Sequence, residues 1–344
     1  MRFLFVGAGA IGTYVGGALA SHGHAVGYIE QPGPADVIAR QGLRLHMGGT
    51  TTAVRHVQLY TSTADALAAG PYDAGVLALK SFDTAGVLDD LVASASAGGE
   101  VPPLLSLQNG VDNEILIAER LGADRVISGT VTSAIGKPGI GEVIEEKRRG
   151  IGIALGSPLS EMIVGALNDA RLGAKLFHDA RGMKWSKLFT NLTGNATSAI
   201  LDMPVGALFA DRRLYEVEIA VLRECLAVMR ARDHRPVDLP GTPVRALALA
   251  VERLPRAIVQ PVLTRALGHG RGDKMPSFHI DLHAGRGRTE VNWLNGAVVR
   301  HGAEVGVEAP VNAVLTETLE ALSHGELDIE EFRHNPDALL RRLA

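Results

Sequence analysis

A lysine and two asparagines recur at four-residue intervals in the middle of the chain, and together they could carry out acid catalysis. They are Lys187, Asn191 and Asn195, and their i, i+4 spacing would place all three on one stripe of a helix. A lysine ammonium can donate a proton to a developing alkoxide, and amide side chains can fix a substrate by hydrogen bonds. Hydride transfer to a ketone requires this chemistry. The same stripe is also common on the solvated face of an amphipathic helix, so the pattern alone leaves both interpretations open.

A second polar cluster lies nearer the end of the chain. Ser277 follows a proline, and residues 289–296 read TEVNWLNG. Within them, Glu290 could take part in catalysis as a carboxylate. Alternatively, Thr289 could cap a helix and Glu290 could occupy its first turn, where the helix dipole favours a carboxylate that has no function.

Two histidines and an aspartate alternate in the same region and raise the question of a metal site. They are His279, Asp281 and His283. Alternate-residue spacing does not by itself converge on an ion, and no further ligand is evident near them in the sequence. We therefore expect no metal.

A glycine-rich turn near the start of the chain could bind a pyrophosphate. The apolar run at residues 3–6 breaks into GAGAIG over residues 7–12, and a helix-like segment follows. Gly7 allows a tight turn, Gly9 lets backbone approach the pyrophosphate, and Gly12 lets a helix pack on a strand. Glu30 ends the second apolar run, 30 − 12 = 18 residues beyond Gly12, near the position expected for a ribose-binding carboxylate. The sequence therefore predicts a dinucleotide site, in which Ala10 and Ile11 also belong to the turn.

Polar side chains follow two later apolar runs. Lys80 comes after residues 74–79, and Asn109, in the tripeptide QNG, comes after residues 104–107. In open parallel sheets the ligand lies beyond the carboxyl ends of the strands, so both residues are candidates for that cleft. Asn-Gly is also an ordinary turn dipeptide, and Lys80 could be a surface ammonium, but their shared position favours function.

The elements that must position these residues follow from periodicity. Short apolar runs alternate with helix-compatible segments, which indicates a parallel sheet with right-handed crossovers. Strands are expected at residues 3–6, 25–29, 74–79, 104–107 and 126–131, and helices near residues 11–21, 35–41, 64–69, 85–94 and 113–121. Residues 141–155 look like an antiparallel hairpin that closes the sheet, and from about residue 158 the pattern is helical. We predict a Rossmann-type α/β doubly wound sheet with an all-α C-terminal domain, divided into a dinucleotide-binding domain at residues 1–178 and a substrate and catalytic domain at residues 179–344.

Composition narrows the class of protein. The chain has 344 residues, 46% hydrophobic and 21% charged, which is enough for two cores. The net charge of −4 and the scattered basic residues argue against nucleic acid as a partner, and no apolar stretch of about 18 residues suggests a membrane span. The lone Cys225 excludes an intramolecular disulfide, so we expect a cytoplasmic protein. A secretory signal in about the first 20 residues is the alternative, although glycines interrupt its apolar run.

Taken together, these motifs resemble the ketopantoate reductase (2-dehydropantoate 2-reductase) family. They are the N-terminal GxGxxG, the later QNG, the WxKLxxN at residues 185–191, and the Pro-Ser followed by TExxxxNG. The resemblance extends from residue 3 to about residue 312.

The resemblance implies a role for each matching residue. Lys187 would protonate the substrate carbonyl as hydride arrives from NAD(P)H, and Glu290 would hold a substrate hydroxyl or tune that lysine. Among the remaining residues, Asn109 would lie beside nicotinamide and substrate, Asn191 and Asn195 would bind substrate hydroxyls, Ser277 would take the carboxylate, and Lys80 would lie near the cofactor. The partner would be a small 2-oxo acid, and a homodimer is possible.

Three departures from the family pattern matter. Where the family has an arginine for the adenosine 2′-phosphate, this chain has Gln31 after Glu30, which favours NADH over the family's usual NADPH. Phe278 replaces the usual Met after Pro-Ser, and one extra residue separates Asp281 from Glu290, which shifts the register of Ser277 and Asp281 more than that of Glu290. Residues 238–273 form a longer connection than usual, either a surface insertion or a lid.

Three functions are compatible with the sequence. The first is reduction of 2-dehydropantoate or another 2-oxo acid, and the second is a dehydrogenase of a β-hydroxy acid. The third is a dinucleotide-sensing protein without catalysis. The presence of Lys187, Asn191 and Glu290 together weighs against a sensor, which needs none of them.

Overall fold

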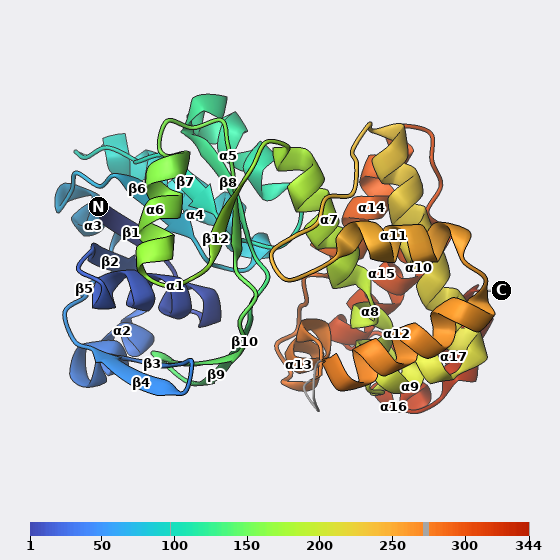
Figure 1. The fold of residues 1–344 in the computed structure, drawn as a ribbon. Coiled ribbons are helices and arrows are strands. Elements are labelled where there is room, and N and C mark those ends of the chain that lie inside the picture. Colours follow the sequence, from blue (N-terminus) through green and yellow to red (C-terminus); the bar gives the residue numbers. More distant parts are fainter. Residues whose placement is uncertain (97, 271–274, 344) are drawn as a thin grey trace. The chain divides into compact units, whose positions relative to one another are not determined.

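The chain folds into two compact units. The structure is a computed structural model and describes residues 1–96, 98–270 and 275–343. The first unit comprises Met1–Lys184 together with Asp238–Thr242, and the second comprises the described residues of Trp185–Val237 and Pro243–Ala344. Each unit has its own arrangement of secondary structure (Figure 1).

The first unit is built on an eight-stranded sheet in the order β12-β11-β8-β7-β6-β1-β2-β5. Its strands are β1 (Arg2–Val6), β2 (Ala25–Ile29), β5 (Gln58–Tyr60), β6 (Ala74–Leu77), β7 (Leu104–Ser106), β8 (Val126–Val131), β11 (Ile151–Ala154) and β12 (Ala174–Phe177). The pairs from β5 to β8 are parallel, whereas β11 runs antiparallel to β8. The five predicted strands are confirmed, and β1 lies near the middle of the sheet.

A separate four-stranded sheet in the first unit contradicts the predicted hairpin. Its order is β4-β3-β10-β9, and its strands are β3 (Leu43–Met47), β4 (Thr50–Val54), β9 (Ala134–Gly139) and β10 (Glu142–Lys147). β10 pairs with β3 and β9, whereas β11 joins the large sheet. The expected hairpin over residues 141–155 is therefore wrong, because its two strands belong to different sheets.

Helices cover both faces of the large sheet. They are α1 (Ala10–Ser21), α2 (Pro32–Gln41), α3 (Thr63–Ala68), α4 (Thr84–Ser96), α5 (Asn113–Leu121) and α6 (Ser160–Asp169), with short 3₁₀ turns at η1 (Ser81–Asp83) and η2 (Ala123–Arg125). In β1, Phe3 and Phe5 belong to the core that contains α1, and Leu4 and Val6 belong to the core that contains α3, α4 and α5. This alternation is expected for a strand buried on both faces.

The second unit is helical throughout its described residues. Its helices are α7 (Ala180–Leu192, which begins in the first unit), α8 (Asn195–Leu201), α9 (Val205–Ala210), α10 (Arg212–Ala231), α11 (Val244–Arg253), α12 (Arg256–Gly270), α13 (Ser277–His283), α14 (Val291–Ala303), α15 (Pro310–His324), α16 (Ile329–Phe332) and α17 (Pro336–Leu343). The predicted fold class, an α/β sheet domain followed by a helical domain, is confirmed. No helix in the part of the chain that the structure describes is both long and apolar enough to cross a membrane.

Two details of the helical half differ from the sequence prediction. Strand β12 interrupts the helical pattern that was expected from about residue 158. The long connection at residues 238–273 is mostly helical, because it contains α11 and α12. Gln260 and Thr264 of α12 donate hydrogen bonds to the carbonyl of Phe209 in α9, so α12 packs within the second unit, whereas Asp238–Thr242 belong to the first. Residues 271–273 of the connection lie outside the described residues.

Candidate active site

The glycine turn joins β1 to α1 in the first unit. Gly7 follows β1 with a φ of +95°, a conformation that favours glycine. A Cβ on Gly12 would lie 2.0 Å from the Gly7 carbonyl oxygen, so a side chain at that position would force the turn apart. Strand and helix therefore approach as closely as the predicted fingerprint requires.

The start of α1 fits a phosphate group. Gly9 is its N-cap and places no side-chain acceptor over the first turn, which begins with Ala10 and Ile11. The first N–H groups of a helix have no partner within the helix, and they attract anions. A Cβ on Gly9 would meet only the Ala78 carbonyl oxygen, at an ordinary 3.7 Å, so packing alone does not demand glycine there. The absence of a side chain leaves the backbone open to close approach by a ligand.

Glu30 links the end of β2 to this turn. One carboxylate oxygen accepts a hydrogen bond from the Ala8 N–H at 2.6 Å, and the other accepts from the Gln31 N–H at 2.8 Å. A carboxylate has about four acceptor positions, so Glu30 retains capacity for ribose hydroxyls. Gln31 is exposed and is the N-cap of α2. These two residues lie where the adenosine ribose was predicted to bind.

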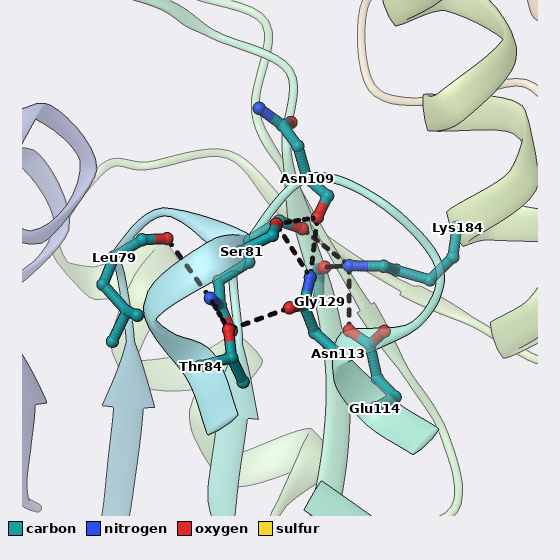
Figure 2. A network of polar contacts seen from close by, with 9 residues as sticks. Leu79, Ser81, Thr84, Asn109, Asn113, Glu114, Gly129 and Lys184 are labelled. Carbon is teal, nitrogen blue, oxygen red and sulfur yellow. Dashed lines mark hydrogen bonds and ion pairs between the residues drawn. The ribbon is translucent and has the colours of Figure 1, made fainter. Parts of the chain in front are cut away.

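The tips of β6 and β7 share a polar network (Figure 2). The Asn109 carbonyl accepts hydrogen bonds from Ser81 Oγ at 3.0 Å and Asn113 Nδ2 at 2.7 Å, while Thr84 Oγ1 donates to Asn113 Oδ1. The Asn109 side chain points away from this network. Lys80, half-buried, precedes Ser81 as the N-cap of η1. The network therefore holds the backbone of Asn109 and leaves its amide directed elsewhere.

A buried lysine that the sequence analysis did not select fastens the start of α7 to the same tips. Lys184 Nζ donates to the Gln108 carbonyl at 2.7 Å and the Gly129 carbonyl at 3.3 Å, and lies 2.8 Å from Glu114 Oε1 (Figure 2). The first two contacts are hydrogen bonds, and the third is an ion pair. Its side chain is only 5% exposed, and these contacts anchor the start of α7 to the strand tips.

Lys187 and Asn191 lie one turn apart on α7, in the second unit. Both are half-buried, among the buried neighbours Leu188 and Leu192. The predicted single stripe is wrong at its third member, because α7 ends at Leu192 and Asn195 begins a new helix, α8. Gly194 breaks the helix with a φ of +65°.

Asn195 and Ser277 are brought together although they lie far apart in the sequence. Asn195 Oδ1 accepts a hydrogen bond from the Phe278 N–H at 3.1 Å, and its Nδ2 lies 3.5 Å from Ser277 Oγ. Asn195 is buried, whereas Ser277 is exposed at the start of α13. Asn195 therefore positions Ser277, and the hydroxyl of Ser277 is the more accessible of the two groups.

Glu290 is buried, with 3% of its surface exposed, and is the N-cap residue of α14. Glu290 therefore lies just before the first turn of α14. The non-catalytic interpretation of the sequence had placed it within that turn. The Thr289 hydroxyl accepts a hydrogen bond from the Val291 N–H at 3.3 Å. A carboxylate this deeply buried requires polar partners, whether protein or ligand.

The alternating histidines have a partner that their sequence spacing does not suggest. Asp281 Oδ1 forms an ion pair with Arg286 Nη1 at 2.5 Å. His279 Nε2 instead lies 2.6 Å from Oδ1 of Asp202, the residue that follows α8. Burial lowers the pKa of His279, and the hydrogen bond from His279 lowers the pKa of Asp202. Asp281 is therefore separate from the two histidines, and Asp202 joins them.

The lone thiol can be set aside as a nucleophile. Cys225 is buried in α10, and burial raises its pKa well above the ordinary value. The thiolate form is therefore suppressed at neutral pH.

The predicted residues thus divide between the units. The first unit gathers the turn and strand-tip residues: Gly7, Gly9, Ala10, Ile11, Gly12, Glu30, Gln31, Lys80 and Asn109. The second gathers Lys187, Asn191, Asn195, Ser277 and Glu290. Sequence reasoning missed Lys184 and Asp202. The sequence carried a signal for Lys184, namely a charged residue between the apolar residues Met183 and Trp185, which are both buried. It carried no signal for Asp202.

A mostly parallel sheet with a glycine turn that fits a dinucleotide, followed by helices that carry a lysine and amides, is typical of nicotinamide-dependent oxidoreductases of two units. Sequence comparison agrees: residues 3–155 match the family described as ketopantoate reductase PanE/ApbA, and residues 179–323 match its C-terminal domain. The chain belongs to this family, whose members act on small 2-oxo acids with NAD(P)H. It is a 2-dehydropantoate 2-reductase-like oxidoreductase.

Individual relatives span nearly the whole chain. A 2-dehydropantoate 2-reductase of Pyrococcus horikoshii is 27% identical over 92% of this chain and 95% of its own length. A 2-dehydropantoate 2-reductase of Archaeoglobus fulgidus is 28% identical over 94% of this chain and 98% of its own length. A PanE/ApbA family ketopantoate reductase from Ralstonia eutropha superposes with a TM-score of 0.79 at 27% identity, covering 95% of this chain and 99% of that structure. D-mandelate dehydrogenase, solved with NADH and anilino(oxo)acetate, shares the fold at a TM-score of 0.77 and 21% identity, over 94% and 99%.

Proposed function

We propose that this protein reduces the C2 carbonyl of 2-dehydropantoate to give pantoate. The observation that carries the proposal is that Lys187 and Asn191 lie one turn apart on α7. The turn of α7 before Lys187 is anchored by Lys184. A proton donor and a hydrogen-bonding amide on one supported helix can be held in a fixed geometry, as carbonyl reduction requires. The names of the relatives favour 2-dehydropantoate as the substrate.

Each candidate site residue of the second unit has a distinct task in this proposal. A reduced nicotinamide, when bound, supplies the hydride for C2. Lys187 donates a proton to the carbonyl oxygen, which would otherwise carry the developing negative charge. Ser277 donates a hydrogen bond to the substrate carboxylate, and Asn195 positions Ser277.

Two further side chains would recognise the rest of the substrate. Glu290 accepts a hydrogen bond from the substrate hydroxyl, and its burial strengthens such a contact to a carboxylate. Asn191 binds the same end of the substrate. Asn109, in the first unit, orients the nicotinamide.

NADH is the proposed cofactor. The turn at Gly7, Gly9 and Gly12 fits the pyrophosphate, and the Glu30 carboxylate accepts hydrogen bonds from an unmodified ribose but repels a 2′-phosphate. Lys80 lies after β6, where it can contribute positive charge to the same cleft. The bound NADH in D-mandelate dehydrogenase, which shares the fold, supports this choice.

A matched pair of substrates tests the proposal. Oxidation of NADH and NADPH is followed with 2-dehydropantoate and with trimethylpyruvate, which has the same branched carbon but lacks the hydroxyl. We expect kcat/KM to be at least about 100-fold higher for 2-dehydropantoate, because the analogue lacks the hydroxyl that Glu290 would bind. Equal rates, or faster turnover of an aryl 2-oxo acid, would reject 2-dehydropantoate as the substrate. Cofactor binding without turnover of any 2-oxo acid would indicate a sensor.

A further inference from the structure

Three side chains in the second unit converge at a place where the proposed reaction has no use for them. Asp202 follows the last residue of α8, and His279 and His283 lie on α13. Their ligand-type atoms all lie within 4.8 Å of one another. The two histidines are four residues apart on one helix, the spacing that puts two imidazoles on the same face for a zinc ion.

The distances are close to those of a metal centre. Asp202 Oδ1 lies 2.6 Å from His279 Nε2 and 4.0 Å from His283 Nε2. In a tetrahedral zinc site with bonds of about 2.0–2.1 Å, donor atoms lie about 3.3 Å apart. The first distance therefore needs to lengthen and the second to shorten, each by about 0.7 Å, and small side-chain rotations can supply both changes.

The surroundings suit coordination by these atoms. Asp202 Oδ2, the oxygen that faces away from the histidines, accepts a hydrogen bond from Arg333 Nε at 3.0 Å. Such a contact orients a ligating carboxylate and leaves its other oxygen available. Arg333 Nη1 also forms an ion pair with Glu330 Oε1 at 2.8 Å, and this carboxylate offsets the positive charge of the guanidinium. The three side chains retain between 13% and 21% exposure, so an ion and a water ligand can reach them.

The contacts observed without an ion are ones that a metal would replace. His279 Nε2 shares a hydrogen bond with Asp202, and His283 Nε2 lies 3.2 Å from the Ala199 carbonyl oxygen. The imidazole rings are stacked, with centroids 4.1 Å apart. Binding of an ion moves the ring protons from Nε2 to Nδ1 and leaves the imidazoles neutral, which is the form that ligates.

We propose that Asp202, His279 and His283 bind one divalent transition-metal ion, zinc by ligand type, with water in the fourth position. Two imidazoles and a carboxylate suit zinc better than magnesium or calcium, which prefer oxygen ligands alone. The ion ties α13 to the end of α8. At the other end of the same pair of helices, Asn195 already binds the first turn of α13. The metal therefore stabilises the helix that carries Ser277 without touching the reacting groups.

Metal binding to the full chain tests this proposal directly. Protein freed of metal by a chelator is titrated with Zn²⁺ by calorimetry and with Co²⁺ by visible absorption. We expect one equivalent per chain, intense tetrahedral Co²⁺ bands, and a thermal midpoint that rises with Zn²⁺. The His279→Gln/His283→Gln variant should lose at least about tenfold in affinity, since even outer-shell partners contribute that much. His324→Gln, which alters an exposed histidine outside the cluster, is the matched control and should bind as the unmodified chain does.

Two results would overturn the site. One is the absence of a saturable equivalent of Zn²⁺ or Co²⁺ on the unmodified protein, and the other is equal affinity in the double variant. The single variants His279→Gln and His283→Gln, each checked for a cooperative melt, replace the double variant if it does not fold. These readouts do not depend on reductase activity, so failure of the proposed reaction and failure of the metal site are distinguishable.

Discussion

The glycine turn of the first unit and the polar side chains of the second unit are built in opposite ways. The turn is defined by backbone and by the absence of side chains, as the 2.0 Å clash of a Cβ on Gly12 shows. The second site is defined by side chains from α7, α8, α13 and α14, and tertiary packing brings Asn195 next to Ser277. If the proposed assignments hold, cofactor affinity depends mainly on backbone geometry, whereas turnover depends on side-chain chemistry. Substitutions should separate the two.

The largest separation is expected at Lys187. Lys187→Met keeps most of the length of the side chain but removes the proton donor, so kcat should fall by about 10²–10⁴-fold. The dissociation constant for NADH, measured by fluorescence titration, should not change, because Lys187 is not among the turn residues. An equal loss of cofactor affinity and turnover would contradict its role as the general acid.

Lys184, three residues earlier on the same helix, should show the reverse pattern. Lys184→Met leaves the Glu114 carboxylate without its cation, which should lower the free energy of unfolding by about 3–5 kcal/mol. Chemical denaturation measures this loss, and Lys175→Met, at an exposed position on β12, is the control, expected within about 0.5 kcal/mol of the unmodified protein. If Lys184→Met were as stable as Lys175→Met, Lys184 would not be an anchor.

A methyl group on the turn should damage cofactor binding alone. Gly12→Ala must displace the Gly7 carbonyl, and a shift of about 1 Å at a binding site can cost about 100-fold. The dissociation constant for NADH should rise accordingly. Gly33→Ala is the control, because a Cβ on Gly33 meets no atom within 4 Å. Unchanged NADH affinity in Gly12→Ala would show that the turn is not the pyrophosphate site.

The smallest effect is expected for the choice between the two nicotinamides. Glu30→Gln retains an acceptor for the Ala8 N–H but removes the charge, so the preference for NADH over NADPH should fall by about tenfold. Asp36→Asn, an exposed carboxylate on α2, is the charge-matched control. A wide preference for NADPH in the unmodified protein would refute the assignment of Glu30.

The sequence predicted the parts of the molecule that local physics determines. β1, the glycine turn and Glu30 belong to one continuous segment, so spacing was sufficient to identify them. The pairing of β10 with β3 was not predictable in this way, because the strands lie about a hundred residues apart and their register depends on tertiary packing. The same holds for Asp202, which meets His279 only through the packing of α8 on α13. Gly194 did carry a local signal, since a glycine within a predicted helix favours an end to it.

Transfer of isotope from cofactor to product tests the proposed reaction most directly. The protein is supplied with 2-dehydropantoate and with NADH deuterated on one face of nicotinamide C4, and in a second reaction with NADH deuterated on the other face. NMR of the product should show deuterium at C2 of pantoate from only one of the two. Nicotinamide oxidation without deuterium at C2 from either face, or no pantoate at all, would contradict the assignment of this chain as a 2-dehydropantoate reductase.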